Sequence, residues 1–303
     1  MFSYHRPAST EEALSILSRE ACVPLAGGTD FYPARVGKPI QENVMDLTGI
    51  RSLRGIEERA EGIWMGALTT WTDVMHADLP EAFQGLQQAS RTIGGVQTQN
   101  AGTLCGNLCN ASPAADSVPN LMALEAQVEL ESVRGSRRLD LQEFILGNRK
   151  TAKVDDELVT GLLIPKPSAN AFGAFEKLGA RKYLVISIVM TGVVAEWNED
   201  QRIGKIRIAV GSCSDKSIRL EKLEKEFQKK INEVRSEVIH LKNIGHEKGI
   251  TKRELLISEK RTELHIELEK NLNELNGQIK PTKNKFSKLK QELSASISKQ
   301  LLS

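Results

Sequence analysis

Two stretches of the sequence combine glycines with hydroxyl, amide and carboxylate side chains. The first is residues 26–30 (Ala-Gly-Gly-Thr-Asp), and the second runs over residues 102–116. Glycine lets the backbone adopt a positive φ and approach a ligand oxygen closely, and successive amides in such a turn form a concavity that binds anions. A Gly-Gly pair after an apolar run is also common in an ordinary tight turn. Only the two stretches together indicate a loop pair around a phosphate and a polyhydroxy chain.

Further short segments accompany these two stretches in a fixed order along the first 220 residues. They are Phe-Ser-Tyr-His-Arg-Pro at 2–7, Val-Met-Asp-Leu at 44–47, Ile-Trp-Met-Gly-Ala at 63–67, Phe-Glu-Lys at 175–177 and Arg-Ile-Ala-Val-Gly at 207–211. The whole pattern resembles the flavin-binding subunit of the molybdenum hydroxylases, the family of xanthine dehydrogenase and carbon monoxide dehydrogenase. In that family an early G-G-T-D/E loop and a later G-T-x-G-G-N…A-S-P-x-x-D stretch hold FAD. Residues after about 220 do not share the resemblance.

The resemblance implies an α+β fold with a defined domain order. Residues 1–168 would form the two-subdomain FAD-binding fold of the xanthine dehydrogenase flavin subunit, divided into 1–43 and 44–168. Residues 169–217 would begin a small, truncated α+β domain, and residues 218–303 would form a helical, coiled-coil-like tail. The implied cofactor is FAD, and the residues expected to bind it are Ala26, Gly27, Gly28, Thr29, Asp30, Ile93, Gly94, Gly102, Thr103, Gly106, Asn107, Cys109, Asn110, Asp116, Val159 and Lys177.

Each group of these residues suits a part of FAD. The first loop offers its amides and the Thr29 hydroxyl to the pyrophosphate, while the Asp30 carboxylate would hold the loop by accepting backbone N–H groups. Thr103, Gly106 and Asn107 suit phosphate and ribityl oxygens, and Asp116 could accept hydrogen bonds from ribityl or ribose hydroxyls. Lys177 is either an electrostatic tuner near the flavin ring or a solvated lysine on a strand.

Two departures from the family pattern affect the detail of the expected site. Cys105 stands where the family often has glycine, and cysteine tolerates a positive φ less well. Thr98-Gln99-Asn100 stands where the family often has Ile-Arg-Asn, which removes a fixed positive charge and a fork of donors. No G-x-G-x-x-G segment follows a predicted strand, so the expected site is not a Rossmann site.

The resemblance also implies a place in a multi-subunit enzyme. A molybdopterin-containing large subunit would oxidise the substrate, a two-iron two-sulfur small subunit would pass single electrons, and FAD would deliver them to an acceptor such as NAD, a quinone or oxygen. No residue of this chain is expected to be catalytic, because the flavin carries the redox chemistry. The sequence leaves open a free-standing flavin oxidase and a non-catalytic scaffold with a coiled-coil tail.

Composition restricts partners and location. Residues 215–303 hold 20 Lys and Arg against 14 Asp and Glu, and the preceding residues hold 21 against 25, so the body is not built for nucleic acid. No run of eighteen apolar residues occurs, which argues against a membrane partner and for a cytoplasmic protein. The four cysteines suggest neither a disulfide framework nor an iron-sulfur cluster. The five scattered histidines show no zinc spacing, so no metal site is expected.

The expected elements place the two glycine stretches. Ser9 to Glu12 reads as a capping box that begins a helix, 22–26 is a strand leading into the first loop, and 44–47 and 63–67 are further strands. The sequence then predicts a helix beginning at 72, another over 83–93, a long irregular segment over 97–115, a core helix over 120–126 and a strand over 128–133. A turn at 135–136 and a closing segment over 154–164 complete the predicted FAD-binding domain.

Beyond residue 172 the sequence predicts a third unit. It begins with a strand over 173–178 and a helix start at Arg181-Lys182, and ends with a hairpin of two strands over 185–197 and 203–210. From Ile218 onward, apolar residues recur at heptad-like spacing, with expected breaks at Gly245, Gly249 and Pro281. This tail reads as a folded-back helical segment, and the alternative is a set of helices that merely cover the third unit's sheet.

Overall fold

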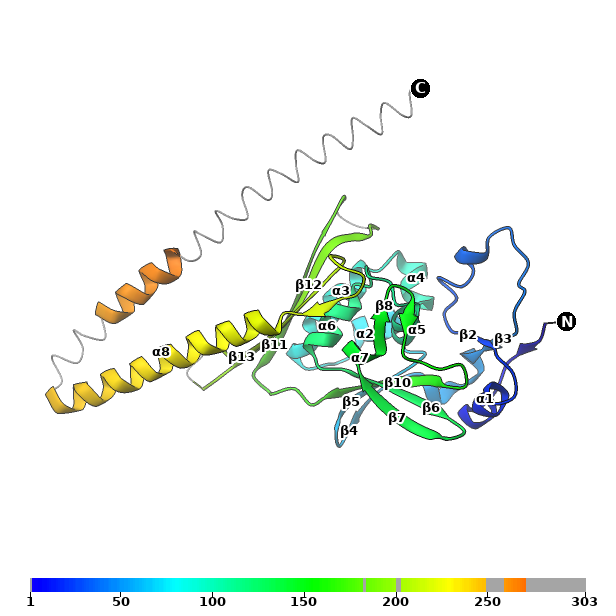
Figure 1. Ribbon diagram of the computed structural model, residues 1–303, viewed down its shortest axis with the longest axis horizontal. Helices are drawn as coiled ribbons and strands as arrows, with labels where there is room; N and C mark the ends of the chain where they lie inside the picture. The colour runs from blue at the N-terminus through cyan, green and yellow to red at the C-terminus, as the bar shows by residue number, and fades with distance from the viewer. Residues whose placement is uncertain (1, 182–183, 200–202, 249–258, 271–303) are drawn as a thin grey trace, which may run out of the picture. The chain divides into compact units, whose positions relative to one another are not determined.

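The computed structural model of the chain describes residues 2–181, 184–199, 203–248 and 259–270, shown as a ribbon in Figure 1. Residues 1–231 form one compact unit and residues 232–303 a second. Within the described residues the first unit holds three larger β-sheets and one two-stranded ribbon. This is the mixed α+β architecture that the sequence predicts.

The N-terminal sheet is parallel and delivers the first glycine loop. Its order is β1-β3-β2, with β1 at Tyr4–His5, β2 at Val23–Leu25 and β3 at Val44–Asp46. Because β3 pairs with both other strands, this sheet extends past the boundary expected at residue 43. The division of the FAD-binding domain at residue 43 stays a prediction.

Helix α1 (Thr10–Leu17) connects β1 to β2 and begins where the sequence predicts. The Ser9 hydroxyl accepts a hydrogen bond from the Glu12 amide at 3.2 Å, as a helix N-cap should. The Glu12 carboxylate accepts from the Ala8 amide, one residue before the position of a standard capping box. Spacings of three and four residues put Ala13, Leu14 and Leu17 on the buried face.

The second sheet is antiparallel and carries the main core. Its strand order is β4-β5-β10-β6-β7, and the strands are β4 (Ile56–Arg59), β5 (Gly62–Gly66), β6 (Gln127–Ser132), β7 (Gly135–Asp140) and β10 (Leu158–Pro165). The helices of this unit are α2 (Trp71–His76), α3 (Gln84–Thr92), α4 (Val96–Ala101), α5 (Leu104–Asn110), α6 (Ser117–Ala123) and α7 (Leu141–Phe144). The ribbon is β8 (Ile145–Gly147) with β9 (Lys150–Thr151). Short 3₁₀ turns lie at Pro33–Arg35, Leu47–Gly49, Arg51–Leu53 and Glu81–Phe83.

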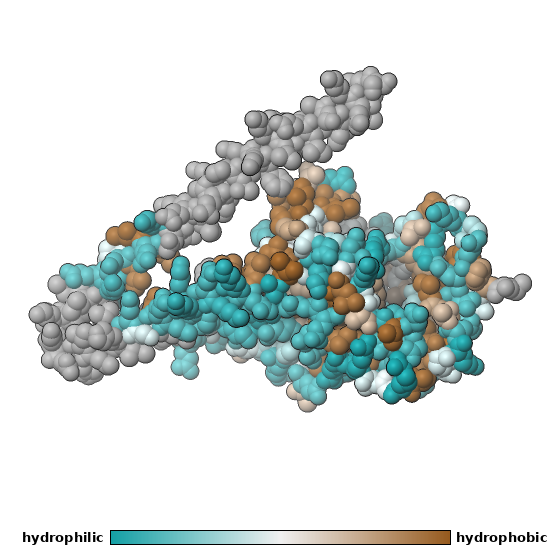
Figure 2. Space-filling model, viewed as in Figure 1, coloured by the Kyte–Doolittle hydropathy of each residue, from teal (hydrophilic) through white to brown (hydrophobic). Residues whose placement is uncertain are grey.

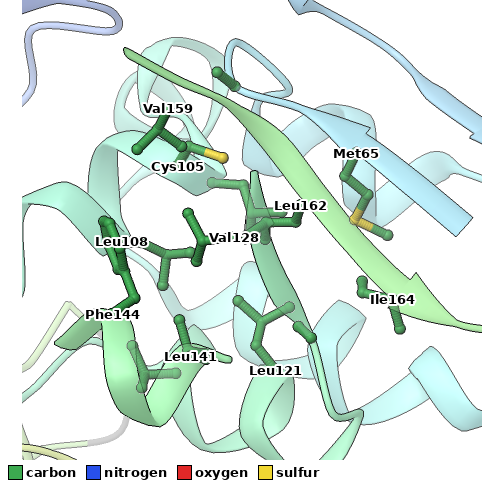
Figure 3. Packing of buried hydrophobic residues seen from close by; sticks show 14 of the residues in the cluster. Met65, Cys105, Leu108, Leu121, Val128, Leu141, Phe144, Val159, Leu162 and Ile164 are labelled. Carbon is green, nitrogen blue, oxygen red and sulfur yellow. The ribbon is translucent and has the colours of Figure 1, made fainter. Parts of the chain in front are cut away.

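Figure 3 shows the core between strand β10 and the helices, where Leu108, Leu121, Val128 and Leu162 meet. All four side chains are inaccessible to solvent. Strand β10 is buried along almost its whole length because it lies in the middle of the sheet, between β5 and β6. This core fixes the position of α5, which begins inside the second glycine stretch.

The segment predicted to be irregular over residues 97–115 is mostly helical. It contains most of α4 and all of α5, and Thr103 caps α5 by accepting from the Gly106 amide at 3.1 Å. Each helix has fewer than two turns, which is too short to display a helical repeat of apolar residues. The sequence therefore could not reveal them by periodicity.

Smaller differences concern element ends. The turn expected at 135–136 lies at 133–134, with Gly135 opening β7, and the last strand of the FAD-binding domain begins at Leu158, after a stretch from 154 without strand structure. Helix α2 begins one residue before Thr72 because Thr70 and Asp73 form a capping box. Helix α6 begins at Ser117, three residues earlier than predicted.

The third sheet has the order β11-β12-β13-β14, with β11 at Ala171–Gly179, β12 at Ser187–Trp197, β13 at Ile203–Gly211 and β14 at Ile218–Arg219. The predicted hairpin of β12 and β13 is confirmed by their antiparallel pairing. The helix start predicted at 181–182 is absent at Arg181, which lies in a bend, and Lys182 is outside the described residues. One face of the sheet packs on α6, where a Cβ at Gly192 would lie 2.6 Å from the Asn120 nitrogen.

Helix α8 (Glu221–Lys248) confirms the predicted helix at the start of the tail. The break predicted at Gly245 is wrong, since α8 continues past this residue. One glycine lowers the stability of a helix without ending it. Hydrophilic residues dominate the visible side of α8 (Figure 2).

Residues 259–270 are also helical, with Ile266 and Leu268 about 60% exposed. Gly249, Pro281 and the apolar positions from 272 onward lie outside the described residues. The coiled coil stays a prediction, and none of the described helices is long and apolar enough to span a membrane.

Candidate functional site

A cavity of about 410 Å³ lies between the first glycine loop and the second. Residues 23–31 line it on one side, and residues from α5 and the segment before it line it on the other. Its volume is in the range of small-molecule and cofactor sites. The two stretches that carry the sequence prediction are therefore brought together in one place.

The two loops touch through glycines that allow no side chain. A Cβ on Gly27 would lie 1.8 Å from the Ala101 carbonyl oxygen, and a Cβ on Gly102 would lie 3.3 Å from the Thr29 hydroxyl. Gly28 has φ +70°, a conformation that favours glycine. The first loop thus depends on both glycines, one for close contact and one for its backbone turn.

The first loop lines the cavity with residues whose backbone donors are unpaired. Within the part of the chain that the structure describes, the amides of residues 27–30 donate to no protein acceptor. Unpaired amides in succession suit a phosphate group. The expected role of Asp30 is not seen, since its exposed carboxylate accepts no hydrogen bond from the described residues.

The second stretch presents one face of α5 to the cavity. The Thr103 hydroxyl oxygen accepts the N-cap hydrogen bond from the Gly106 amide, and its O–H remains able to donate to a ligand. The Asn107 Oδ1 atom accepts from the Ser117 hydroxyl at 2.8 Å. Its Nδ2 group donates to no acceptor in the described residues and is free for a ligand.

Thirteen of the sixteen predicted residues line the cavity, which leaves out Gly94, Asp116 and Lys177. Gly94 has φ +57° and lies next to the cavity wall, because Ile93 and Thr98 both line the cavity. A Cβ on Gly94 would lie 2.8 Å from the Thr98 side chain. The lining members of the predicted set are Ala26, Gly27, Gly28, Thr29, Asp30, Ile93, Gly102, Thr103, Gly106, Asn107, Cys109, Asn110 and Val159.

Asp116 and Lys177 pair with each other inside the protein. The Lys177 ammonium lies 2.5 Å from Asp116 Oδ2, and only 11% and 7% of the two side chains are exposed. Asp116 also accepts from the Ser187 hydroxyl at 2.5 Å and from the Thr92 hydroxyl at 3.3 Å. The pair joins the start of α6 to strands β11 and β12, and each oxygen of the Asp116 carboxylate accepts from a protein donor.

Three cationic residues of the cavity wall were not identified from the sequence: Arg35, Arg149 and Lys153. Arg35 pairs with Glu42 and stacks over the Phe31 ring at 3.9 Å. Arg149 donates to the Asn110 side chain, and Lys153 donates to the carbonyl of Val154 at 3.0 Å. Only Arg149 had a local signal, its place in the polar Gly-Asn-Arg-Lys turn at 147–150.

Two cysteines occupy α5. Cys105 is 2% exposed, and burial raises the pKa of its thiol well above the usual value. Cys109 lines the cavity and is exposed as a residue, yet desolvation by neighbouring protein raises the pKa of its thiol to about 11. Both thiols are therefore protonated at neutral pH, and the four cysteines of the chain form no common cluster.

The chain is similar in sequence to flavin subunits. Residues 1–167 match the family described as the FAD binding domain in molybdopterin dehydrogenase. The nicotinate dehydrogenase FAD-subunit of Eubacterium barkeri is 35% identical over 205 residues, which cover 64% of this chain and 69% of the relative. The glyceraldehyde dehydrogenase medium chain of Sulfolobus acidocaldarius is 32% identical over 241 residues, covering 77% and 83%.

The fold is similar to that of a solved family member. Reconstituted CO dehydrogenase from Oligotropha carboxidovorans contains a chain that superposes with a TM-score of 0.69 at 28% identity, covering 74% of this chain and 79% of that one. The family match extends over more than half of the present chain and includes both glycine loops. The chain therefore belongs to the FAD-binding medium subunits of the molybdenum hydroxylases.

Proposed function

We propose that this chain binds one FAD between its two glycine loops and relays electrons within a molybdenum hydroxylase complex. The observation that carries the proposal is the cavity whose wall combines unpaired backbone amides with three cationic side chains. Such a wall suits a pyrophosphate, and the side chains along α5 suit the hydroxyls next to it.

The residues that would hold FAD divide by chemistry. Amides of residues 27–30 would bind the pyrophosphate, with Arg149 and Lys153 adding positive charge. The free Nδ2 group of Asn107 would donate to a ribityl or phosphate oxygen. Apolar wall residues such as Ile93 and Val159 would exclude water from the ring.

When bound, FAD accepts and releases two electrons one at a time or as a pair, which joins single-electron donors to two-electron acceptors. The protein's own part is to bind, orient and shield the cofactor. Neither Asp116 nor Lys177 lines the cavity, so we assign this pair the structural role of joining the start of α6 to the third sheet.

Family membership supports a proposal for the partners and the acceptor. Carbon monoxide dehydrogenase relatives are named medium chains, which supports a complex with a molybdopterin-containing large subunit and a two-iron two-sulfur small subunit. We propose that FAD passes its electrons to an acceptor such as NAD, a quinone or oxygen.

Purification of the tagged chain from its native cells tests this proposal. We expect co-purifying subunits that bring molybdenum and iron in fixed ratio to flavin, and we expect the isolated chain to oxidise no purine, aldehyde or carbon monoxide. Substrate oxidation by the isolated, molybdenum-free chain would instead support a free-standing flavin oxidase. A folded chain that FAD cannot reconstitute would support a scaffold.

FAD should shield Cys109 from alkylation. Cys109 lines the cavity, whereas Cys213 is exposed elsewhere and provides a reference in the same molecule. Because the thiolate is the reactive form, the raised pKa makes Cys109 slow to react, and labelling is best followed at about pH 9 by peptide mass spectrometry. Added FAD should slow labelling of Cys109 and leave Cys213 unchanged, and equal slowing of both would contradict the assigned cavity.

Asn107→Ala should weaken FAD binding about two- to tenfold, because a net hydrogen bond contributes about 0.5–1.5 kcal/mol. Flavin fluorescence titration measures the change. Ser117→Ala is the matched control, since it removes the same contact to Asn107 but leaves the free Nδ2 group in place. Equal weakening in both variants would show that the loss comes from disturbed packing and not from a cofactor contact.

A further inference from the structure

Three side chains with metal-binding chemistry meet in the N-terminal sheet, at residues for which the sequence predicted no metal. His5 ends β1, Glu20 follows α1, and Cys22 immediately precedes β2. One potential ligand atom from each lies within 4.8 Å of the others. We propose that His5, Glu20 and Cys22 form a binding site for one Zn²⁺ ion.

The His5 ring supports this assignment. Its Nε2 atom lies 3.0 Å from Glu20 Oε1, yet this buried atom has no hydrogen-bond partner among the described residues. The two atoms are close without the geometry of a hydrogen bond, as expected when both face a common third point. A buried ring nitrogen without a partner is costly, and a metal ion would satisfy it.

The donor set suits zinc in type and charge. Imidazole nitrogen, carboxylate oxygen and thiolate sulfur are all zinc ligands, at about 2.0–2.3 Å from the metal. The thiolate and the carboxylate together balance the charge of a divalent ion. The three side chains would supply three ligands, and a water molecule would supply the fourth ligand of a tetrahedral site.

Asn43 orients the Glu20 carboxylate by a hydrogen bond. Its Nδ2 group donates to Glu20 Oε2 at 2.8 Å, which leaves Oε1 directed at His5. Asn43 is itself fixed, because its Oδ1 accepts from the Ser3 amide at 2.9 Å and its carbonyl accepts from the Val23 amide at 2.8 Å. Such outer contacts orient metal ligands in known sites.

Zinc bound here would join β1, the end of α1 and the start of β2. Strand β2 runs directly into the first glycine loop, so the metal would stabilise the part of the fold that presents residues 26–30. This inference does not depend on the proposed electron relay, because it concerns another set of side chains.

Zinc titration of the tag-free full-length chain against a chromophoric chelator tests the site. We expect one tightly bound Zn²⁺ in the parent chain. Cys22→Ser and Glu20→Gln should weaken binding by at least about tenfold, and Asn43→Ala by about tenfold. Cys213→Ser is the matched control with an exposed cysteine elsewhere, and it should bind zinc as the parent does. Circular dichroism and FAD content show which variants remain folded.

Cobalt substitution gives a second readout that needs no loss of affinity. Co²⁺ bound by the parent chain should show a thiolate charge-transfer band that disappears in Cys22→Ser and persists in Cys213→Ser. If His240, His246 or His265 of the tail bound the metal instead, Cys22→Ser would keep the zinc affinity of the parent chain. The cobalt-loaded parent chain would then show no thiolate band. That result, or the absence of tight zinc binding in the parent chain, would overturn the proposal.

Discussion

Gly27→Ala is expected to reduce FAD affinity by about a hundredfold. The added Cβ would lie 1.8 Å from the Ala101 carbonyl oxygen, and backbone cannot move aside as a flexible side chain can. Milder overpacking already costs about 1–3 kcal/mol, and about 2.8 kcal/mol corresponds to a hundredfold change in affinity. The two loops would have to separate, which pulls the amides of residues 27–30 away from their ligand.

Gly147→Ala is the matched control for this substitution. Its added Cβ would lie 3.4 Å from the Asp215 carboxylate, an ordinary contact with the end of a side chain. FAD affinity from fluorescence titration and unfolding midpoints of the FAD-free proteins should be measured for both variants. Parental FAD affinity in folded Gly27→Ala would show that the loop contact does not shape the cofactor site.

The sequence predicted the glycine loops because glycine is the residue type that tolerates a positive φ and a close backbone contact. The positive φ of Gly28 is a local property, whereas the segment that Gly27 contacts was not visible in the motif. The predicted strands were also found near their expected positions, since alternating or continuous apolar runs mark burial. Helices α4 and α5 were not predicted because neither is long enough to show a helical repeat of apolar residues.

Contacts between distant segments could not be predicted from residue spacing. Arg149 and Lys153 reach the cavity only because β10 and the segment before it pack beside α5. The cluster of His5, Glu20 and Cys22 has no recognisable zinc spacing, because the parallel sheet and α1 bring its members together. The partner of Asp116 lies 61 residues away on β11, so its role could not be read from the motif around it.

Asp116→Ala is expected to lower the free energy of unfolding by about 3–5 kcal/mol, because it leaves the buried Lys177 charge without its partner. The Lys177 ammonium is 2.5 Å from the carboxylate and 11% exposed, and the Ser187 hydroxyl would lose its acceptor as well. Lys177→Met should be destabilising for the converse reason, since it leaves a buried carboxylate.

A double-mutant cycle separates this pairing from a direct role in FAD binding. The Asp116→Ala/Lys177→Met protein should lose less stability than the two single losses added together, because neither charge is then left buried alone. The same cycle at Glu58 and Lys166, a pair 2.7 Å apart with both side chains 70% exposed, should show little coupling. Urea unfolding of the FAD-free proteins measures stability, and fluorescence titration measures affinity. If Asp116→Ala kept parental stability while losing FAD affinity, the carboxylate would be a cofactor ligand, as the family motif suggests, and the pair with Lys177 would be incidental.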